Sequence, residues 1–272
     1  MPNTPYRITA PFAGIGSAVE RALAYLGGLA QLLGRALTHA FISPLKRSLS
    51  VQRACHQAMS VGVEALPVIS FITFFIGVIM ALQGAYELKR FGALHLVADT
   101  VAISITRELG PLVTAIVVIG RSGSAFAAEI GTMKVTEELD ALETMALHPI
   151  AFLVTPKLLA MLIMMPCLTI WADLMGVLGG SSFGISGADY TFGTYFVATR
   201  DALYMRDIIT GLVKSLVFGL VITGVGCQEG FATGAGSEEV GRATTSAVVT
   251  SIFLIVLVDL VFTAVFYVTG GG

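Results

Sequence analysis

Charged side chains lie inside stretches of this 272-residue sequence that are otherwise apolar. Arg107 and Glu108 are neighbours in one such stretch, while Asp173, Lys214 and Asp259 lie singly in three others. A charge at the centre of a lipid bilayer costs about 2.5–3.5 kcal/mol on insertion scales, so each group needs an opposite charge, a cavity or water. For the three single residues this favours ion pairs between helices, for instance Lys214 with Asp173 or Asp259.

Arg107 and Glu108 lie just before Gly110 and Pro111. Neighbouring residues of a helix point about 100° apart, so these two side chains do not face each other. A proline removes a backbone hydrogen bond and bends or interrupts a helix, as happens where a cavity or substrate site is built in a membrane protein. We therefore expect Arg107 and Glu108 to belong to a functional site.

The run Gly120-Arg-Ser-Gly123 superficially resembles the nucleophile motif of a rhomboid-type intramembrane protease. That chemistry needs a base within hydrogen-bond reach of the serine. All four histidines lie outside the apolar stretches: His39, His56, His95 and His148. An intramembrane serine hydrolase is therefore disfavoured, and the three cysteines have no metal-ligand spacing.

The composition is that of an integral membrane protein. Hydrophobic residues make up 55% of the chain and charged residues 12%, whereas soluble domains carry roughly 25% charged residues. The net charge of −2 and the absence of a basic run argue against a nucleic-acid partner. Five stretches can cross a hydrocarbon core of about 30 Å; they cover about residues 66–86, 96–120, 158–180, 208–227 and 247–268.

Lysine and arginine are distributed unevenly between the two sides of these spans. Most of them fall on the side of the N-terminus, which includes the connection over residues 121–157. The positive-inside rule therefore predicts a cytoplasmic N-terminus and a C-terminus on the opposite, outer side, which would be the periplasmic side in a double-membrane bacterium. An ion-coupled secondary transporter is the alternative function, but its usual inverted repeats are not visible, and five spans do not divide into two matching halves.

The first 60 residues contain a helical pattern before the first span. Apolar residues recur at helical spacing over residues 15–37, with Glu20, Arg21, Gln31 and Arg35 between them. This predicts an amphipathic helix. It lies in the membrane interface or packs on the flank of the protein, and the sequence leaves both readings open.

A polar helix is predicted after the second span, over about residues 132–148. Thr136 can cap it, Glu137 suits the positive end of its dipole, and Pro149 ends it. One face carries an apolar stripe of Val135, Leu139, Leu142 and Met145. The stripe must pack either on the protein's own helix ends or on a cytoplasmic partner.

Small residues follow each other at four-residue spacing where the second span ends. One row consists of Gly120, Ser124 and Ala128, and the neighbouring row consists of Gly123, Ala127 and Gly131. Such rows allow close approach of helix backbones in a membrane. The packing is either within the chain or between subunits.

The segment Arg107-Glu-Leu-Gly-Pro111, with Gly120-Arg121, Ala128-Glu-Ile-Gly-Thr-Met-Lys-Val-Thr-Glu137 and Asp140-Ala-Leu-Glu-Thr-Met145, resembles the hallmark segment of the MlaE family. These proteins are permease subunits of ABC transporters that move phospholipid or other lipids between the membranes of double-membrane bacteria, with relatives in Mce systems and chloroplasts. Lys214-Ser215 and Gly241-Arg-Ala-Thr-Thr-Ser246 extend the resemblance to roughly residues 50–268.

The resemblance implies an all-α homodimer in the bacterial inner membrane that maintains outer-membrane lipid asymmetry. Each subunit would have an N-terminal interfacial region, residues 1–60, and a permease domain, residues 61–272. A periplasmic MCE-domain ring and a STAS-domain protein are the implied accessories. The chain is expected to be no enzyme and to bind no cofactor, because it lacks a Gly-x-x-x-x-Gly-Lys-[Ser/Thr] loop, so ATP is expected to be hydrolysed on a separate cytoplasmic chain.

The resemblance also implies two sets of functional residues. The segment 129–149 would be the coupling helix in a groove of the ATPase, with contacts from Glu129, Thr132, Met133, Glu137, Leu139, Asp140, Leu142 and Met145. In the first span, one face with Ile76, Met80 and Gln83 can line an acyl-chain cavity, where the flexible Met80 adapts to different chains. A cation can hold a lipid phosphate by paired hydrogen bonds. The predicted lipid site is Ile76, Met80, Phe91, Arg107, Glu108 and Lys214, in which Glu108 orients Arg107 or its neighbours and Lys214 adds a second positive charge.

Overall fold

Every regular element of the part of the chain that the structure describes is helical. The computed structural model describes residues 10–42, 47–187 and 192–269. Within them, five helical stretches are long and apolar enough to cross a membrane: Gln52–Arg90, Leu94–Val135, Ile150–Ser182, Met205–Ala232 and Ser237–Val268. Each contains one predicted span, so the all-α membrane class and its five spans are confirmed.

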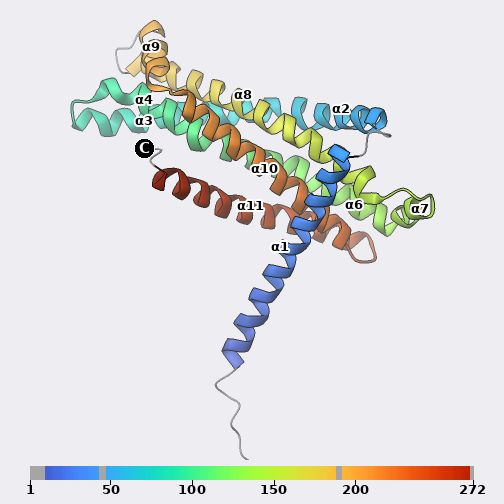
Figure 1. Ribbon diagram of the computed structural model, residues 1–272. Helices are drawn as coiled ribbons and strands as arrows, with labels where there is room; N and C mark the ends of the chain where they lie inside the picture. Colours follow the sequence, from blue (N-terminus) through green and yellow to red (C-terminus); the bar gives the residue numbers. More distant parts are fainter. Residues whose placement is uncertain (1–9, 43–46, 188–191, 270–272) are drawn as a thin grey trace, which may run out of the picture.

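The long helices lie side by side along one axis, which is horizontal in Figure 1. The four longest of this bundle are α3 (Leu66–Arg90), α8 (Thr155–Gly187), α10 (Met205–Ala232) and α11 (Ser237–Val268). The short helix α7 (Glu138–Thr144) lies at one end. The opposite end holds α9 (Phe192–Ala202) and the turn from α3 to α4 (Val97–Ser104).

The second span is one continuous helix that contains two π turns. Pro111 has no N–H to donate, and its ring would clash with a carbonyl of the preceding α-helical turn. A π turn directly precedes it, in which the Gly110 N–H donates to the carbonyl of Ile105. The expected interruption at the proline is therefore a π turn, a feature common at functional sites. In order, the segments are α4, η3 (Ile105–Leu109), α5 (Gly110–Val118), η4 (Ile119–Gly123) and α6 (Ser124–Val135).

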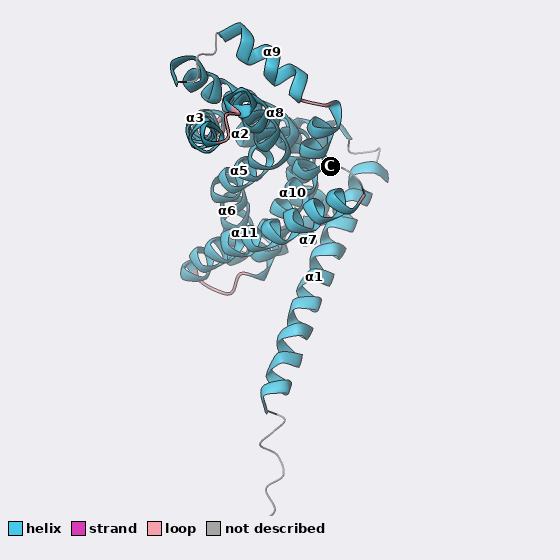
Figure 2. Cartoon of the chain, turned by 90° about the vertical axis from the view of Figure 1, so that its left-hand side faces the viewer, coloured by secondary structure: helices cyan, strands magenta, loops and turns pink. Residues whose placement is uncertain are grey.

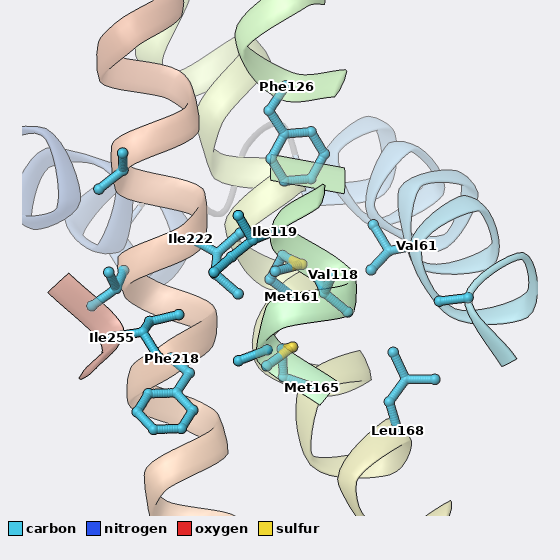
Figure 3. Close-up of a cluster of buried hydrophobic side chains, with 14 of the residues drawn as sticks. Val61, Val118, Ile119, Phe126, Met161, Met165, Leu168, Phe218, Ile222 and Ile255 are labelled. Atoms are coloured by element: carbon cyan, nitrogen blue, oxygen red, sulfur yellow. The ribbon is translucent and has the colours of Figure 1, made fainter. Parts of the chain in front are cut away.

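A central apolar core holds the bundle together. In Figure 3, side chains from α2 (Arg47–Val63), α8, α10, α11 and the second span converge on one another. The core includes Val61, Val118, Ile119, Phe126, Met161, Met165, Leu168, Phe218, Ile222 and Ile255. All are nearly or fully buried, so burial of apolar surface fixes the helices at mid-length.

The row of small residues Gly123, Ala127 and Gly131 packs within the chain. A Cβ added at Gly226 would lie 2.8 Å from the carbonyl oxygen of Gly123, and one at Gly230 would lie 3.1 Å from that of Ala127. A Cβ at Gly131 would lie 2.8 Å from Thr233 Oγ1. For this row, the reading of packing within the chain is therefore confirmed.

The N-terminal helix α1 (Ala10–Ile42) runs across the bundle axis, and its first part projects away from the other helices in Figures 1 and 2. Leu29 and Ala36 are buried against the bundle, whereas Val19 and Leu23 are exposed. The helix therefore packs on the flank over its second half. An interfacial position for the projecting half stays a prediction.

The contact between α3 and α8 generates a test. A Cβ at Gly77 would overlap the carbonyl oxygen of Gly176, whereas a Cβ at Gly84 on the same helix meets nothing within 4 Å. We expect Gly77→Ala to lower the free energy of unfolding by about 3 kcal/mol, because backbone cannot move aside without separating the helices. Gly84→Ala is the control and should leave stability unchanged or raise it, since alanine favours helix. Thermal unfolding in detergent measures both, and equal midpoints would contradict the proposed contact.

Candidate functional site

The side chain of Lys214 on α10 is fully enclosed, with 0% of its surface exposed. Its Nζ lies 2.5 Å from Oε2 of Glu108 and 2.9 Å from Oδ1 of Asp259. It also donates a hydrogen bond of 3.0 Å to Oγ1 of Thr263, whose hydroxyl in turn donates to Oε1 of Glu108 at 3.0 Å. One ammonium group thus joins three elements, namely the π turn η3, α10 and α11.

Local backbone features bring these groups together. A Cβ at Gly211 would overlap the carbonyl oxygen of Thr106 in the π turn, so α10 approaches η3 closely there. Lys214 follows Gly211 by about one helical turn and therefore faces the same neighbour. Asp259 and Thr263 are four residues apart on α11 and lie on one face of it. Thr263 was not predicted, although this spacing from Asp259 is the signal that could have found it.

The predicted partners of Lys214 are partly confirmed. The pair with Asp259 is formed, whereas Asp173 lies elsewhere, on the wall of a separate cavity. Glu108 was expected to orient Arg107 or its neighbours, and in the structure it contacts Lys214 and Thr263. The physical reason is that adjacent helical positions point in different directions, so Glu108 and Arg107 meet different neighbours.

Arg107 lies near the start of α10. Its Nε is 3.6 Å from Oδ1 of Asp207, and 31% of the arginine side chain is exposed. Asp207 also accepts a hydrogen bond from the N–H of Tyr204, which caps α10. Asp207 lies seven residues before Lys214, two helical turns along the same face. The two cations of the predicted site therefore contact points of α10 about 10 Å apart along its axis.

The predicted apolar part of the lipid site is dispersed. Met80 packs against a cluster with Ala81, Val101 and Ile105, between α3 and the second span. Ile76 is half-buried. Phe91 is 80% exposed at the end of α3. None of the six predicted lipid-binding residues lines either of the two cavities described for the structure, so the structure brings only Glu108 and Lys214 together.

The apolar stripe of α7 turns inward. Leu139 and Leu142 are 9% and 7% exposed, and they belong to a core cluster with Ile130, Val154 and Leu158. For these two leucines the reading of packing on the protein's own helix ends is confirmed, and an exposed docking stripe is wrong. The exposed residues of α7 are Glu138, Asp140, Ala141, Glu143 and Thr144. Glu137 and Met145, which flank the helix, are exposed as well. The exposed face is therefore mainly acidic.

The predicted helix over residues 132–148 is shorter than expected. Residues 132–135 form the last turn of α6. Glu137 has a φ of +61°, which interrupts the helix before α7 begins. Thr136 does not cap α7, because its hydroxyl donates to the carbonyl of Thr132 at 3.0 Å and so closes α6. Ala146, with a φ of +56°, ends the segment before Pro149 is reached.

Two further ion pairs cross-link the α7 end of the bundle. Lys157 Nζ is 2.7 Å from Oε2 of Glu129, and the lysine side chain is 2% exposed. Arg121 pairs with Glu64 and donates to the carbonyl of Ser60 at 2.9 Å. Lys157 and Glu64 were not predicted, although a charge beside the first residues of an apolar span is the signal that marks both.

A polar cavity of about 150 Å³ lies between α2 and the end of the second span. His56, Arg121, Ser122 and Glu129 are on its wall. No hydrogen bond joins Ser122 to His56, so the serine lacks the activated geometry of a nucleophile. Of the other predicted coupling residues, Thr132 is exposed and Met133 is half-buried.

The sequence matches the family model described as "Permease MlaE" over residues 54–265. It is 42% identical to a probable ABC transporter permease protein of Rickettsia prowazekii over 228 residues, which covers 84% of this chain and 88% of the relative. It is 35% identical over 210 residues to the intermembrane phospholipid transport system permease protein MlaE of Haemophilus influenzae, covering 77% and 80%. The chloroplastic protein trigalactosyldiacylglycerol 1 of Arabidopsis thaliana is 35% identical over 229 residues, covering 84% and 65%.

Replacing Lys214 tests the enclosed cluster. Lys214→Met keeps the length of the side chain but leaves Glu108 and Asp259 without their cation. We expect the free energy of unfolding to fall by about 3–5 kcal/mol, because an unpaired charge in the interior is costly. Lys89→Met, at an exposed position of α3, is the matched control and should be neutral. An unchanged unfolding midpoint for Lys214→Met would show that the cluster does not stabilise the bundle.

Proposed function

Because this chain belongs to the MlaE permease family, we propose that it is the membrane subunit of an ATP-binding cassette transporter that moves phospholipids between the inner and outer membranes of a bacterium. The observation that carries the proposal is the family match, which runs through all five spans. The name of the Haemophilus relative supports phospholipid as the substrate. Such transport would maintain the lipid asymmetry of the outer membrane.

A separate cytoplasmic ATPase supplies the energy in this proposal, since the sequence contains no phosphate-binding loop of its own. We place the ATPase contact at α7. Leu139 and Leu142 fasten the helix to the bundle, while Asp140, Glu143 and Met145 are exposed beside one another. A push on the exposed face would reach α6 and α8 through the two buried leucines.

A homodimer is supported by the surface of α11. Only 11% of the residues in its most apolar window are buried within the chain. Phe253, Val256, Leu260 and Val261 are among its exposed apolar residues. In a dimer, a second copy would cover part of this surface and lipid the rest. The family and the five spans support placement in the inner membrane, and the distribution of basic residues supports a cytoplasmic N-terminus.

In this proposal, the periplasmic and cytoplasmic partners bind at opposite ends of the helix bundle. A periplasmic MCE-domain ring would sit at the end that carries α9 and the turn after α3. The ATPase, and a STAS-domain protein bound with it, would sit at the end that carries α7. The separation of the two ends in Figure 1 supports this arrangement.

Arg107 is the better candidate for a lipid phosphate. Its side chain is 31% exposed, and a guanidinium group can hold a phosphate by paired hydrogen bonds. Lys214 is enclosed and already has three acceptors around its three N–H donors. It could reach a headgroup only after Glu108 or Asp259 moved away.

The exposed face of α7 is tested by reversing its charge. We expect Asp140→Lys combined with Glu143→Lys to leave the membrane domain folded but to lower recovery of the ATPase in a pull-down at least ten-fold, because repulsive contacts oppose docking. Glu87→Lys, at an exposed position on α3, is the control and should not change recovery. Leu142→Arg should instead destabilise the domain itself, since it places a charge in the core. Full recovery of an active complex with the doubly reversed variant would rule out this face.

The headgroup role is tested by Arg107→Gln, which removes the charge while keeping a hydrogen-bonding side chain. We expect phospholipid that co-purifies with the assembled transporter, measured by mass spectrometry, to fall at least five-fold. Arg107→Lys should retain part of it, because it preserves the charge but not the paired geometry. Arg90→Gln, at an exposed position on α3, is the control. Wild-type levels of bound phospholipid in Arg107→Gln would exclude Arg107 as the ligand.

A further inference from the structure

The polar cavity between α2 and the end of the second span lies at the depth of lipid headgroups. Its walls come from α2, η4 and α6. The apolar spans begin at about residue 66 and end at about residue 120, so Ser60 and Ser122 on the wall lie roughly 9 Å and 3 Å beyond them at 1.5 Å per residue. The headgroup layer on each face of a bilayer is about 5–8 Å thick. The cavity therefore begins where a membrane presents its headgroups.

Polar side chains on the cavity wall have capacity for further hydrogen bonds. Ser122 is only 5% exposed, yet its hydroxyl keeps accessible surface, and the cavity is the space that it lines. Neither this hydroxyl nor Gln57 on the opposite wall has a hydrogen-bond partner among the described residues. Oε2 of Glu129 accepts from Lys157 at 2.7 Å, whereas Oε1 has no partner in the same part of the chain. The wall therefore offers a hydroxyl, an amide and a carboxylate oxygen to an occupant.

The charges around the cavity balance. Arg121 on its wall pairs with Glu64, and Glu129 on its wall pairs with Lys157. Both wall residues are accessible, with 31% and 45% of their side chains exposed. They are eight residues apart, about 12 Å along the helix. An anion would meet the charge of Glu129 and a cation that of Arg121, whereas a molecule that carries both charges is attracted at both ends.

An exposed apolar face of α2 leads away from the cavity. Met59 and Val63 follow His56 by three and seven residues, so they lie on the same face of the helix as this wall residue. They are 67% and 57% exposed. Val61, in contrast, points into the central core in Figure 3. A polar cavity beside an exposed apolar surface suits a molecule that has both a headgroup and chains.

We propose that this cavity binds the headgroup of a phospholipid that carries a primary amine, as in phosphatidylethanolamine. Arg121 and the Ser122 hydroxyl would donate to the phosphate, and the ammonium would donate to Oε1 of Glu129. The acyl chains would lie along Met59 and Val63, in the leaflet on the α7 side. This second site rests on the proposed function, which it deepens by naming a headgroup, and it lies about 20 Å along the second span from the Arg107 site.

Size and chemistry select a primary amine. The volume of about 150 Å³ is well below the range of about 300–1,000 Å³ for whole small-molecule sites, so the cavity accommodates a headgroup and leaves the chains outside. An ammonium has three N–H donors for carboxylate oxygens. The quaternary ammonium of phosphatidylcholine has none and is held in proteins by cages of aromatic rings. Phe126 and His56 are the only aromatic residues on the wall, too few for a cage.

The experiment uses the purified full chain in micelles of an uncharged detergent and a phosphatidylethanolamine that carries a diazirine near the start of one acyl chain. After photolysis, mass spectrometry locates the label. We expect labelled α2 peptides that contain Met59 or Val63. Unlabelled phosphatidylethanolamine should compete about ten-fold better than phosphatidylcholine or phosphatidylglycerol with the same chains, because neither of these presents an N–H donor to Glu129 with a positive charge.

Four other results would overturn the proposal. Equal competition by phosphatidylcholine would mean that the ammonium N–H groups are not recognised, and stronger competition by phosphatidylglycerol would identify an anion site. Competition by soluble glycerophosphoethanolamine as strong as that by the lipid would identify a water-soluble ligand. Absence of label in α2 would mean that only water fills the cavity. Because binding by the purified chain includes no transport step, each of these results would leave the transport proposal to its own tests.

Variants separate the cavity from nonspecific partition of the lipid. Ala125→Phe fills the cavity from an exposed position on its wall and should lower labelling about ten-fold; Gln57→Phe fills it from α2 if the first variant does not fold. Glu129→Gln keeps an acceptor for Lys157 and should abolish the preference for ethanolamine over choline. Ile116→Phe, at an exposed position on α5 that lines neither cavity, is the matched control. Unchanged labelling in folded Ala125→Phe or Gln57→Phe, or an unchanged preference in Glu129→Gln, would show that the lipid binds elsewhere.

Discussion

The enclosed ammonium of Lys214 is the constraint on which the arrangement of the membrane helices depends. It lies between carboxylates from the second and fifth spans, donates hydrogen bonds to Glu108 and Thr263, and forms an ion pair with Asp259. Separating any of these helices would leave a charge without its partner in an apolar medium, where each such group costs several kcal/mol. The last span buries little apolar surface within the chain, so this cluster is a main polar tie between α11 and its neighbours.

In the rest of the bundle, charged contacts lie toward the two ends, and apolar packing lies between them. The π turn η3, formed just before Pro111, supplies Glu108 and Arg107, and α10 approaches it closely at Gly211. The central core in Figure 3 is apolar. Toward the α7 end, the pair of Lys157 with Glu129 connects α8 to α6, and the pair of Arg121 with Glu64 connects the π turn η4 to the residue directly after α2. A displacement of α7 would therefore act on helices that are linked by charge and not by apolar contact alone.

The different orientations of Arg107 and Glu108 in η3 give the two cations Arg107 and Lys214 different environments. Adjacent residues of η3 face different neighbours, so Arg107 lies by the start of α10 while Glu108 neutralises Lys214. The side chain of Lys214 is fully buried among its partners, whereas 31% of the Arg107 side chain is exposed. In the proposed transport, binding and helix association would thus use different charges, which allows a headgroup to bind without breaking the tie between the spans.

The sequence by itself determined the class of the protein, its five spans and the family, and it limited the partner of Lys214 to Asp173 or Asp259, between which the structure selected Asp259. These follow from strong local signals, since a long apolar run must be a span and a charge inside it must be paired. The sequence also pointed to the exceptional backbone at Gly110 and Pro111, where the structure has a π turn.

Only the tertiary structure decided which face of each helix is covered. The apolar stripe of α7 was visible in the sequence, but its burial against Ile130, Val154 and Leu158 depends on contacts between distant segments. Likewise, the sequence did not identify the partner of Glu108, and the π turn and the close approach at Gly211 bring it to Lys214. The cavity beside Asp173 exists because three helices meet there. Such choices depend on how helices rotate and cross, which periodicity along one helix does not specify.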